Sequence, residues 1–209
     1  MMMGLFVLTG CAGGQPTWDD EEPEANGSEI NESSEISDFE VRTFDVNPIV
    51  AIEIQGHGTI EVELKPEYAP ITVTNFINLV EEGFYDGLTF HRIIEGFMIQ
   101  GGDPAGNGTG GSDQMIPGEF ANNGIENPLR HERGVISMAR QGHDNNSASS
   151  QFFIMHQNTP FLDDDYAAFG TVISGMEIVD TLANTPAQPQ SGTVEPADQP
   201  MMTSIRVIN

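Results

Sequence analysis

The 209-residue chain has one cysteine and few basic residues. A single cysteine cannot form a disulfide within the chain, and it cannot supply a cysteine cluster for a metal ion. The chain holds 7 Lys+Arg against 32 Asp+Glu, which gives a formal net charge of −25. Because the phosphate backbone of a nucleic acid requires a basic surface, this composition argues against nucleic acid as a partner.

Lysine is especially scarce, since Lys65 is the only one in the chain. Residues 19–45 hold 11 acids and one base, and the remaining residues hold 21 acids and 6 bases. An acid-rich, lysine-poor surface keeps a protein soluble in high salt, but an ordinary acidic protein can have the same composition. The charge leaves both interpretations open, and the length suits one domain plus an extension.

The amino end lacks a long apolar run, because residues 5–8 are too few to span a bilayer. The sequence LTGC at residues 8–11 resembles a lipobox, the site where prokaryotes attach acyl chains to a cysteine after signal cleavage. On this interpretation residues 1–11 are a signal remnant and Cys11 is the lipidation site. The mature protein is then a lipoprotein anchored to the membrane outside the cytoplasm, on the envelope or periplasmic side. The alternative is a disordered start with a chance cysteine.

Residues 12–45 are rich in Gly, Ser, Asn and acidic side chains. Such a segment buries too little apolar surface to fold, and its like charges keep it extended. We therefore interpret residues 12–45 as an acidic, disordered tether between the amino end and a folded domain over residues 46–209.

The pattern of the folded domain is that of a mainly β protein. Residues 49–64 alternate apolar and polar side chains on both sides of QGHG, which predicts a β-hairpin. Residues 70–81 place apolar side chains at helical spacing after a proline, and residues 175–185 predict a second helix. Several further short apolar runs predict strands. Many short strands with two helices predict a closed antiparallel barrel capped by the two α-helices.

Three other patterns suggest chemistry that their context does not support. GNGTGG at residues 106–111 imitates a nucleotide-binding loop, but the residues that follow contain a proline and have no helical period. The serines of residues 147–150 lack the turn motif of a hydrolase nucleophile. The spacing of the histidines fits no standard metal-ligand set, so no metal or cofactor is expected. The five histidines are His57, His91, His131, His143 and His156.

The segment FHRIIEGFMIQGGD at residues 90–103 places an arginine and a glutamine within two apolar strands. Strand alternation predicts that Phe90, Arg92 and Ile94 share one face, and that Met98 and Gln100 share another. If the strands pair, the guanidinium lies beside a methionine and an amide. The alternative is a plain apolar core from which Arg92 extends outward to water.

These residues and motifs resemble those of the cyclophilins, a family of peptidyl-prolyl cis–trans isomerases. The segment at residues 90–103 is similar to the central motif of that family almost letter for letter. NGTGG, GVISMA, SQFFI, FLD and FGTVISGMEIVD follow in the order of the family. The resemblance covers residues 48–209. It implies an eight-stranded closed barrel with two capping helices and an active groove on its outer surface.

The resemblance also implies roles for individual residues. Arg92 matches the catalytic arginine, which assists rotation by stabilising the twisted amide, and Gln100 matches a glutamine that binds the substrate backbone. The residues that match the proline pocket are Phe97, Met98, Phe153 and Leu162. The other matching groove residues are Ala139, Gln151, Phe161 and Tyr166, of which Phe161 and Tyr166 stand where many eukaryotic members have tryptophan and histidine.

The function implied is acceleration of X-Pro bond rotation in folding proteins, without a cofactor. Because no bond is broken, the reaction requires no nucleophile or metal. Proline-containing polypeptides are the expected partners, and the chain is expected to be a monomer by analogy with other small members. The alternative is a non-catalytic module or adaptor that binds proline peptides through the same groove.

Overall fold

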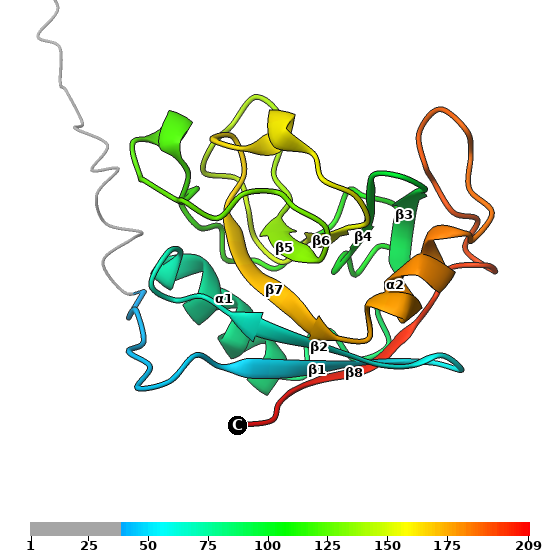
Figure 1. Cartoon of the computed structure of the whole chain (residues 1–209), viewed down its shortest axis with the longest axis horizontal. Helices are drawn as coiled ribbons and strands as arrows, with labels where there is room; N and C mark the ends of the chain where they lie inside the picture. The colour runs from blue at the N-terminus through cyan, green and yellow to red at the C-terminus, as the bar shows by residue number, and fades with distance from the viewer. Residues whose placement is uncertain (1–38) are drawn as a thin grey trace, which may run out of the picture. The chain divides into compact units, whose positions relative to one another are not determined.

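The computed structural model describes residues 39–209, and the predicted lipidation site at Cys11 lies outside these residues. Within them the chain forms eight strands, two α-helices and two short 3₁₀ helices (Figure 1). The strands are β1 Ile49–Ile54, β2 Gly58–Leu64, β3 Phe90–Ile94, β4 Met98–Gly101, β5 Val135–Met138, β6 Phe152–Met155, β7 Ala168–Ser174 and β8 Met202–Val207. The helices are α1 Pro70–Glu81, η1 Ala121–Asn123, η2 Pro160–Leu162 and α2 Met176–Ala183. The predicted hairpin and both predicted helices are confirmed.

The eight strands form one antiparallel sheet in the order β3-β4-β6-β5-β7-β2-β1-β8. The sheet curls into a half-barrel (Figure 1). The closed barrel predicted from the sequence is not confirmed, because the end strands β3 and β8 share no ladder. One isolated bridge joins Thr89 to Met201 at this seam. Beyond it the free edge of β3 binds residues 192–194 instead, through Ile93 N–H to the Gly192 carbonyl oxygen at 2.7 Å.

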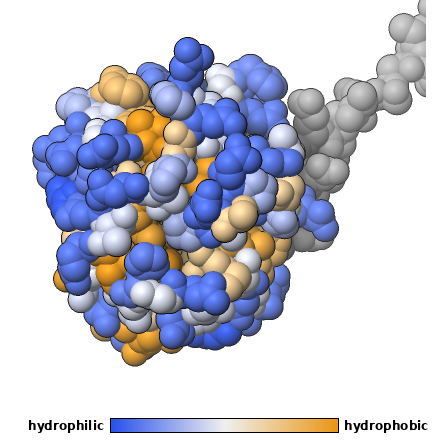
Figure 2. Space-filling view, turned by 90° about the vertical axis from the view of Figure 1, so that its right-hand side faces the viewer, coloured by the Kyte–Doolittle hydropathy of each residue, from blue (hydrophilic) through white to orange (hydrophobic). Residues whose placement is uncertain are grey.

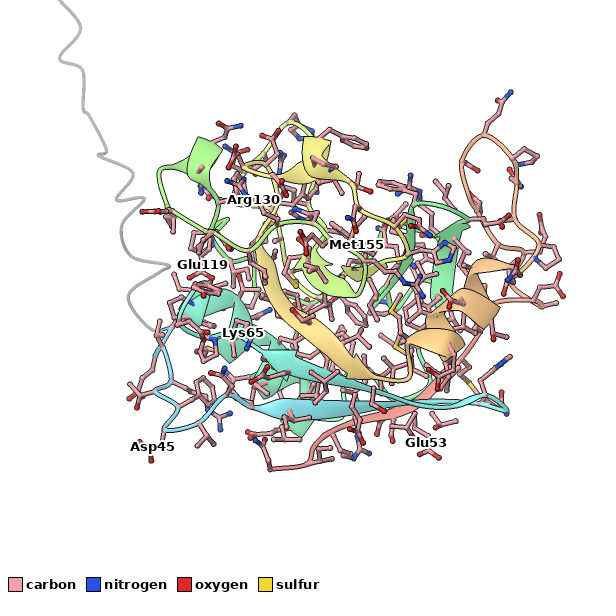
Figure 3. All side chains as sticks on the ribbon, viewed as in Figure 1. Asp45, Glu53, Lys65, Glu119, Arg130 and Met155 are labelled. Atoms are coloured by element: carbon pink, nitrogen blue, oxygen red, sulfur yellow. The ribbon has the colours of Figure 1, made fainter. Side chains whose placement is uncertain are left out.

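Helix α1 begins at Pro70, where the missing N–H of proline costs the helix nothing. Its apolar positions Val73, Phe76, Ile77 and Val80 are all buried. Neighbouring backbone N–H groups in its first turn donate to the carboxylate of Glu119, including Thr72 N at 2.7 Å to Oε2 (Figure 3). Glu119 thus binds the N-terminal end of α1 from a distant loop, and burial raises the pKa of its carboxyl group.

An aromatic cluster fills the space between α1 and the sheet. Phe76 lies 5.1 Å from Tyr85 and 5.2 Å from Phe169 between ring centroids, and Phe152 meets Phe76 edge-on at 5.5 Å. These four side chains are fully buried. Burial of one such side chain contributes about 1.5–3 kcal/mol to the free energy of unfolding. The cluster therefore stabilises the packing of α1 against the sheet.

Residues just before β1 contact the folded domain. Arg42 donates its backbone N–H to Thr74 Oγ1 at 3.0 Å, and its guanidinium pairs with Glu81 at 2.9 Å. The predicted tether covers residues 12–45, of which the structure describes residues 39–45. Within this described part, Arg42 binds α1. Among the described residues, no helix is long and apolar enough to cross a membrane.

Candidate active site

A β-bulge at His91 places the side chains of Phe90 and Arg92, which lie two residues apart, on opposite faces of the sheet. The register of β3 against β4 shifts between Phe90, which pairs with Gly101, and Arg92, which pairs with Gln100. Phe90 is fully buried and packs on the core aromatic cluster, whereas Arg92 is only half-buried. The expectation that Phe90 and Arg92 share a face is therefore wrong, because the extra residue of the bulge breaks the alternation of the strand.

The guanidinium of Arg92 is fixed by two acceptors from different parts of the chain. Its Nη1 donates to Gln100 Oε1 at 3.1 Å, and its Nε donates to the backbone carbonyl of Ser191 at 2.9 Å. Gln100 in turn donates to Gln151 Oε1 at 2.9 Å, and Gln151 donates to the carbonyl of Gly110 at 2.7 Å. This series of hydrogen bonds fixes the orientation of the Arg92 guanidinium, because Gln151 orients the amide of Gln100 and Gln100 in turn orients Arg92.

Arg92 keeps its positive charge without a carboxylate partner in the described part of the chain, where both of its hydrogen-bond acceptors are neutral. Glu95 is exposed at the β3–β4 turn and forms no ion pair with it. Burial lowers the pKa of Arg92, but an arginine remains protonated at neutral pH because its ordinary pKa is above 12. A partly desolvated cation with spare N–H groups attracts a ligand that offers electron density.

A cavity of about 280 Å³ lies beside this guanidinium, with apolar side chains on one side and polar groups on the other. Met98, Phe153 and Leu162 form buried walls, and the Phe153 ring meets Tyr166 edge-on at 5.8 Å. Eight of the residues predicted from the sequence line this cavity: Arg92, Phe97, Met98, Gln100, Ala139, Phe153, Leu162 and Tyr166. The fold thus brings together positions that lie far apart in the sequence.

The two other predicted groove residues lie next to this cavity. Gln151 lines a second cavity of about 210 Å³, which shares Gln100 and Ala139 with the first. Phe161 lines neither of these two cavities. Its ring stacks on Phe97 at 5.9 Å and is 74% exposed, so it forms a rim.

Arg140 lies where the two cavities meet. Its guanidinium carbon lies 4.9 Å from the Tyr166 ring centre and 5.3 Å from that of Phe120, and its Nε donates to the Asp165 carbonyl. Contact with two aromatic faces fixes this arginine in place. The groove therefore contains a second ordered cation, although the chain as a whole is strongly acidic.

The glycine-rich segment at residues 106–111 lines the groove with backbone rather than binding a nucleotide. Asp103 is buried and its carboxylate accepts the N–H groups of Ala105, Asn107 and Gly108. These hydrogen bonds hold the loop in a tight turn, and Asn107 and Gly108 line the first cavity. Sequence reasoning missed this role, although an acid followed by a run of glycines and an asparagine is typical of a turn built around a carboxylate.

Two more lining residues were missed, His91 and Thr193. His91 is 3% exposed, and neither ring nitrogen has a hydrogen-bond partner in the structure. Burial lowers the pKa of His91, so the ring stays neutral and adds no charge beside Arg92. Thr193 belongs to the loop after α2, whose polar sequence gave no sign of contact with the site.

His131, Asp163 and Ser137 have the connectivity of a hydrolase triad. His131 Nδ1 lies 3.0 Å from Asp163 Oδ1, and its Nε2 lies 3.0 Å from Ser137 Oγ. Ser137 is fully buried, so its hydroxyl is closed to substrate. The His131 ring instead stacks on Phe153, an apolar wall of the first cavity, at 6.0 Å between ring centroids. Burial also lowers the pKa of His131.

Together the half-barrel and the groove define a class of protein that can hold an apolar group beside a guanidinium whose acceptors, within residues 39–209, are both neutral. Residues 49–207 match the family model described as "Cyclophilin type peptidyl-prolyl cis-trans isomerase/CLD". The chain belongs to this family. The match spans all eight strands and every groove residue named above.

Similar proteins agree with this assignment. The chain is 50% identical to peptidyl-prolyl cis-trans isomerase B of Bacillus subtilis over 131 residues, 63% of this chain and 87% of that one. It is 45% identical to a peptidyl-prolyl cis-trans isomerase of Helicobacter pylori over 127 residues, 60% of this chain and 74% of that one. A crystal structure of a cyclophilin-type isomerase of Cryptosporidium parvum, solved in the presence of the dipeptide Ala-Pro, has a TM-score of 0.68 and 34% identity. That comparison covers 77% of this chain and 99% of that one.

Proposed function

We propose that this protein accelerates cis–trans rotation of X-Pro bonds in polypeptides, and that Arg92 stabilises the twisted amide. One observation carries the proposal: a guanidinium with no carboxylate partner in the described chain is fixed beside a cavity whose apolar walls leave room for a proline ring. The family membership and the Ala-Pro dipeptide of the Cryptosporidium parvum structure support the same substrate class.

The chemistry of the reaction explains why such a site suffices. Rotation must break amide resonance, which costs roughly 18–20 kcal/mol. In the twisted state the prolyl nitrogen becomes pyramidal and regains a lone pair, which both planar isomers lack. A fixed cationic donor directed at that nitrogen therefore stabilises the transition state more than either isomer. No bond breaks, so the reaction needs no nucleophile from the Ser137–His131–Asp163 cluster, whose serine is fully buried.

The remaining groove residues have binding roles in this proposal. Phe97, Met98, Phe153 and Leu162 surround the proline ring, and the walls exclude water from the amide. In the free protein, Gln100 donates its Nε2–H to Gln151 and accepts a hydrogen bond from Arg92 at Oε1. A bound peptide carbonyl competes for that amide, so Gln100 both orients Arg92 and receives the substrate backbone.

A second candidate function is binding of proline peptides without turnover. NMR exchange spectroscopy of an Ala-Pro peptide with substoichiometric protein separates the two. The proposal predicts faster cis–trans exchange that scales with protein concentration. Shifts of the peptide resonances that saturate without faster exchange would show binding alone and would overturn the enzyme proposal.

For localisation we propose a lipid anchor at Cys11, which places the isomerase outside the cytoplasm at a membrane surface. The proposal rests on the sequence LTGC and on the polar, acidic residues that follow it. Expression of the full chain and a Cys11→Ser variant in a bacterial host tests it by detergent phase partitioning. Transfer of the wild type alone to the detergent phase supports the anchor, and equal partitioning of both proteins rejects it.

A further inference from the structure

The loop that follows α2 reaches the catalytic arginine, and its residues 188–194 form a closed turn. Gln188 and Thr193 are joined by a backbone hydrogen bond of 2.8 Å, and the N–H of Gly192 donates to the Gln188 carbonyl at 2.8 Å. The hydroxyl groups of Ser191 and Thr193 lie 2.8 Å apart. In Figure 1 this orange loop stands beside β3, and Figure 2 shows that side of the molecule as mostly hydrophilic with separate hydrophobic patches.

The loop binds the free edge of β3 on both sides of Arg92. The N–H of Ile93 donates to the Gly192 carbonyl at 2.7 Å, and the N–H of Val194 donates to the His91 carbonyl at 3.0 Å. Between these two bonds, Arg92 forms a β-bridge with the loop. The backbone of the catalytic arginine is therefore paired on one side with β4 and on the other with the loop.

The same loop also holds the side chain of Arg92. The Ser191 carbonyl accepts the Nε–H at 2.9 Å, while Gln100 accepts from Nη1 on another side of the guanidinium. Two acceptors at different atoms fix a planar group far better than one, because rotation about the last side-chain bonds breaks at least one contact. Within residues 39–209 the side-chain hydrogen bonds of Arg92 use Nε and Nη1. The N–H groups of Nη2 are therefore available to a bound peptide.

Gly192 is the residue that permits this docking. Its φ is +74°, a region that L side chains rarely adopt. A Cβ at this position would lie 2.8 Å from the Ile93 carbonyl oxygen and would also overlap Cγ1 of Ile94. Any side chain must therefore push the loop away from β3, and the Ser191 carbonyl moves with it.

We propose that Gly192 is a positioning residue for the isomerase reaction, acting through the Ser191 carbonyl that orients Arg92. This inference rests on the proposed role of Arg92. The loop should therefore affect the turnover rate of bound peptide strongly and the peptide dissociation constant only weakly.

The direct test compares Gly192→Ala with Gly124→Ala. Gly124 has a φ of +82°, but nothing lies within 4 Å of a Cβ built there, so its substitution adds similar backbone strain without displacing the loop. We expect Gly192→Ala to slow exchange of saturating Ala-Pro peptide by about ten- to a hundredfold, the scale of an ångström misplacement. The peptide dissociation constant should change less than about threefold, since the apolar side chains of the cavity lie outside the loop, which contributes only Thr193 to the lining. Gly124→Ala should match the wild type in both measurements.

Two further measurements keep the test decisive if Gly192→Ala folds poorly. Ser191→Ala removes the Ser191 hydroxyl contacts within the loop but keeps the carbonyl, so it should lower turnover only severalfold in a folded protein. Hydrogen exchange of the Arg92 Nε–H, followed by NMR, should be protected in the wild type and faster in both loop variants. A merely structural loop would leave that proton unaffected.

The outcomes separate the two proposals. If the wild type fails to catalyse, or Arg92→Ala retains full turnover, the proposed function or the role of Arg92 fails. If Arg92→Ala loses turnover while folded Gly192→Ala keeps it, the inference about the loop fails alone. It also fails if Gly124→Ala loses turnover as severely as Gly192→Ala, or if the Arg92 Nε–H exchanges freely in the wild type.

Discussion

Arg92 and Gln100 lie directly opposite each other on β3 and β4, and their side chains meet through a hydrogen bond of 3.1 Å between Nη1 and Oε1. The pair places a charged donor beside a neutral acceptor. A neutral partner orients the guanidinium without cancelling its charge, which an acid at the same position would do. The identity of residue 100 should therefore control catalysis through electrostatics as well as shape.

Gln100→Glu tests this relationship with almost no change of shape. The new carboxylate would pair with Arg92, raise the pKa of the guanidinium and reduce its pull on the prolyl nitrogen. We expect turnover to fall by about tenfold or more. The measurement is the exchange rate of saturating Ala-Pro peptide. Gln157→Glu adds the same charge outside the groove and should have little effect, and equal losses in both variants would point to net charge instead.

Phe161→Ala should weaken peptide binding while leaving the stability of the folded protein almost unchanged. The ring is 74% exposed and its contact in the site is the stack on Phe97, so its loss should change the free energy of unfolding by no more than about 0.5 kcal/mol. Peptide affinity should weaken severalfold because Phe97 loses the ring that holds it. Denaturant unfolding and peptide titration measure the two quantities. A large loss of stability would contradict the assignment of Phe161 as a rim residue.

Glu119 should be a structural residue, since its carboxylate binds the N–H groups of Ile71 and Thr72 at the start of α1. Glu119→Ala leaves one buried and one partly buried donor without a partner and should cost about 2–3 kcal/mol of unfolding free energy. Glu119→Gln keeps one acceptor oxygen and should cost less. Thermal unfolding of the two variants checks this order, and an equal loss in both would contradict it.

The stability of the protein should fall as the pH drops below 6.5, the ordinary pKa of histidine, because His91 is held neutral. Burial lowers the pKa of His91, so below 6.5 the unfolded chain binds a proton that the folded protein resists. The contribution is fully present above 6.5 and is lost as the pH falls toward the lowered pKa. His91→Phe has no group to protonate there. Its thermal midpoint should therefore decline less than that of the wild type between pH 8 and pH 5.5, and parallel curves would refute the assignment.

The sequence predicts most of what local patterns encode. The alternation around QGHG and the apolar spacing after Pro70 depend on residues close together in the chain, and both elements are present where predicted. The resemblance to a known family supplied the groove residues, eight of which line one cavity. Their roles in binding and catalysis remain predictions until they are measured.

What the sequence did not predict depends on contacts between distant segments. The bulge at His91 arises because Phe90 must enter the core while Arg92 must face the groove, a conflict that is visible only once both surroundings are known. The barrel was expected to close, but residues 192–194 occupy the edge of β3 that β8 would need. A polar loop with one glycine shows no periodicity from which such docking can be read.

The most direct test of the account is a paired measurement on the wild type and Arg92→Ala. For each protein, NMR exchange spectroscopy gives the turnover of an Ala-Pro peptide at saturation, and titration gives its dissociation constant. Arg42→Ala, which removes an arginine that lies before β1 and pairs with Glu81 of α1, is the control and should match the wild type. The account predicts that Arg92→Ala loses about a hundredfold or more in turnover while peptide affinity changes only modestly. Full turnover in folded Arg92→Ala would contradict the claim that this guanidinium stabilises the twisted amide.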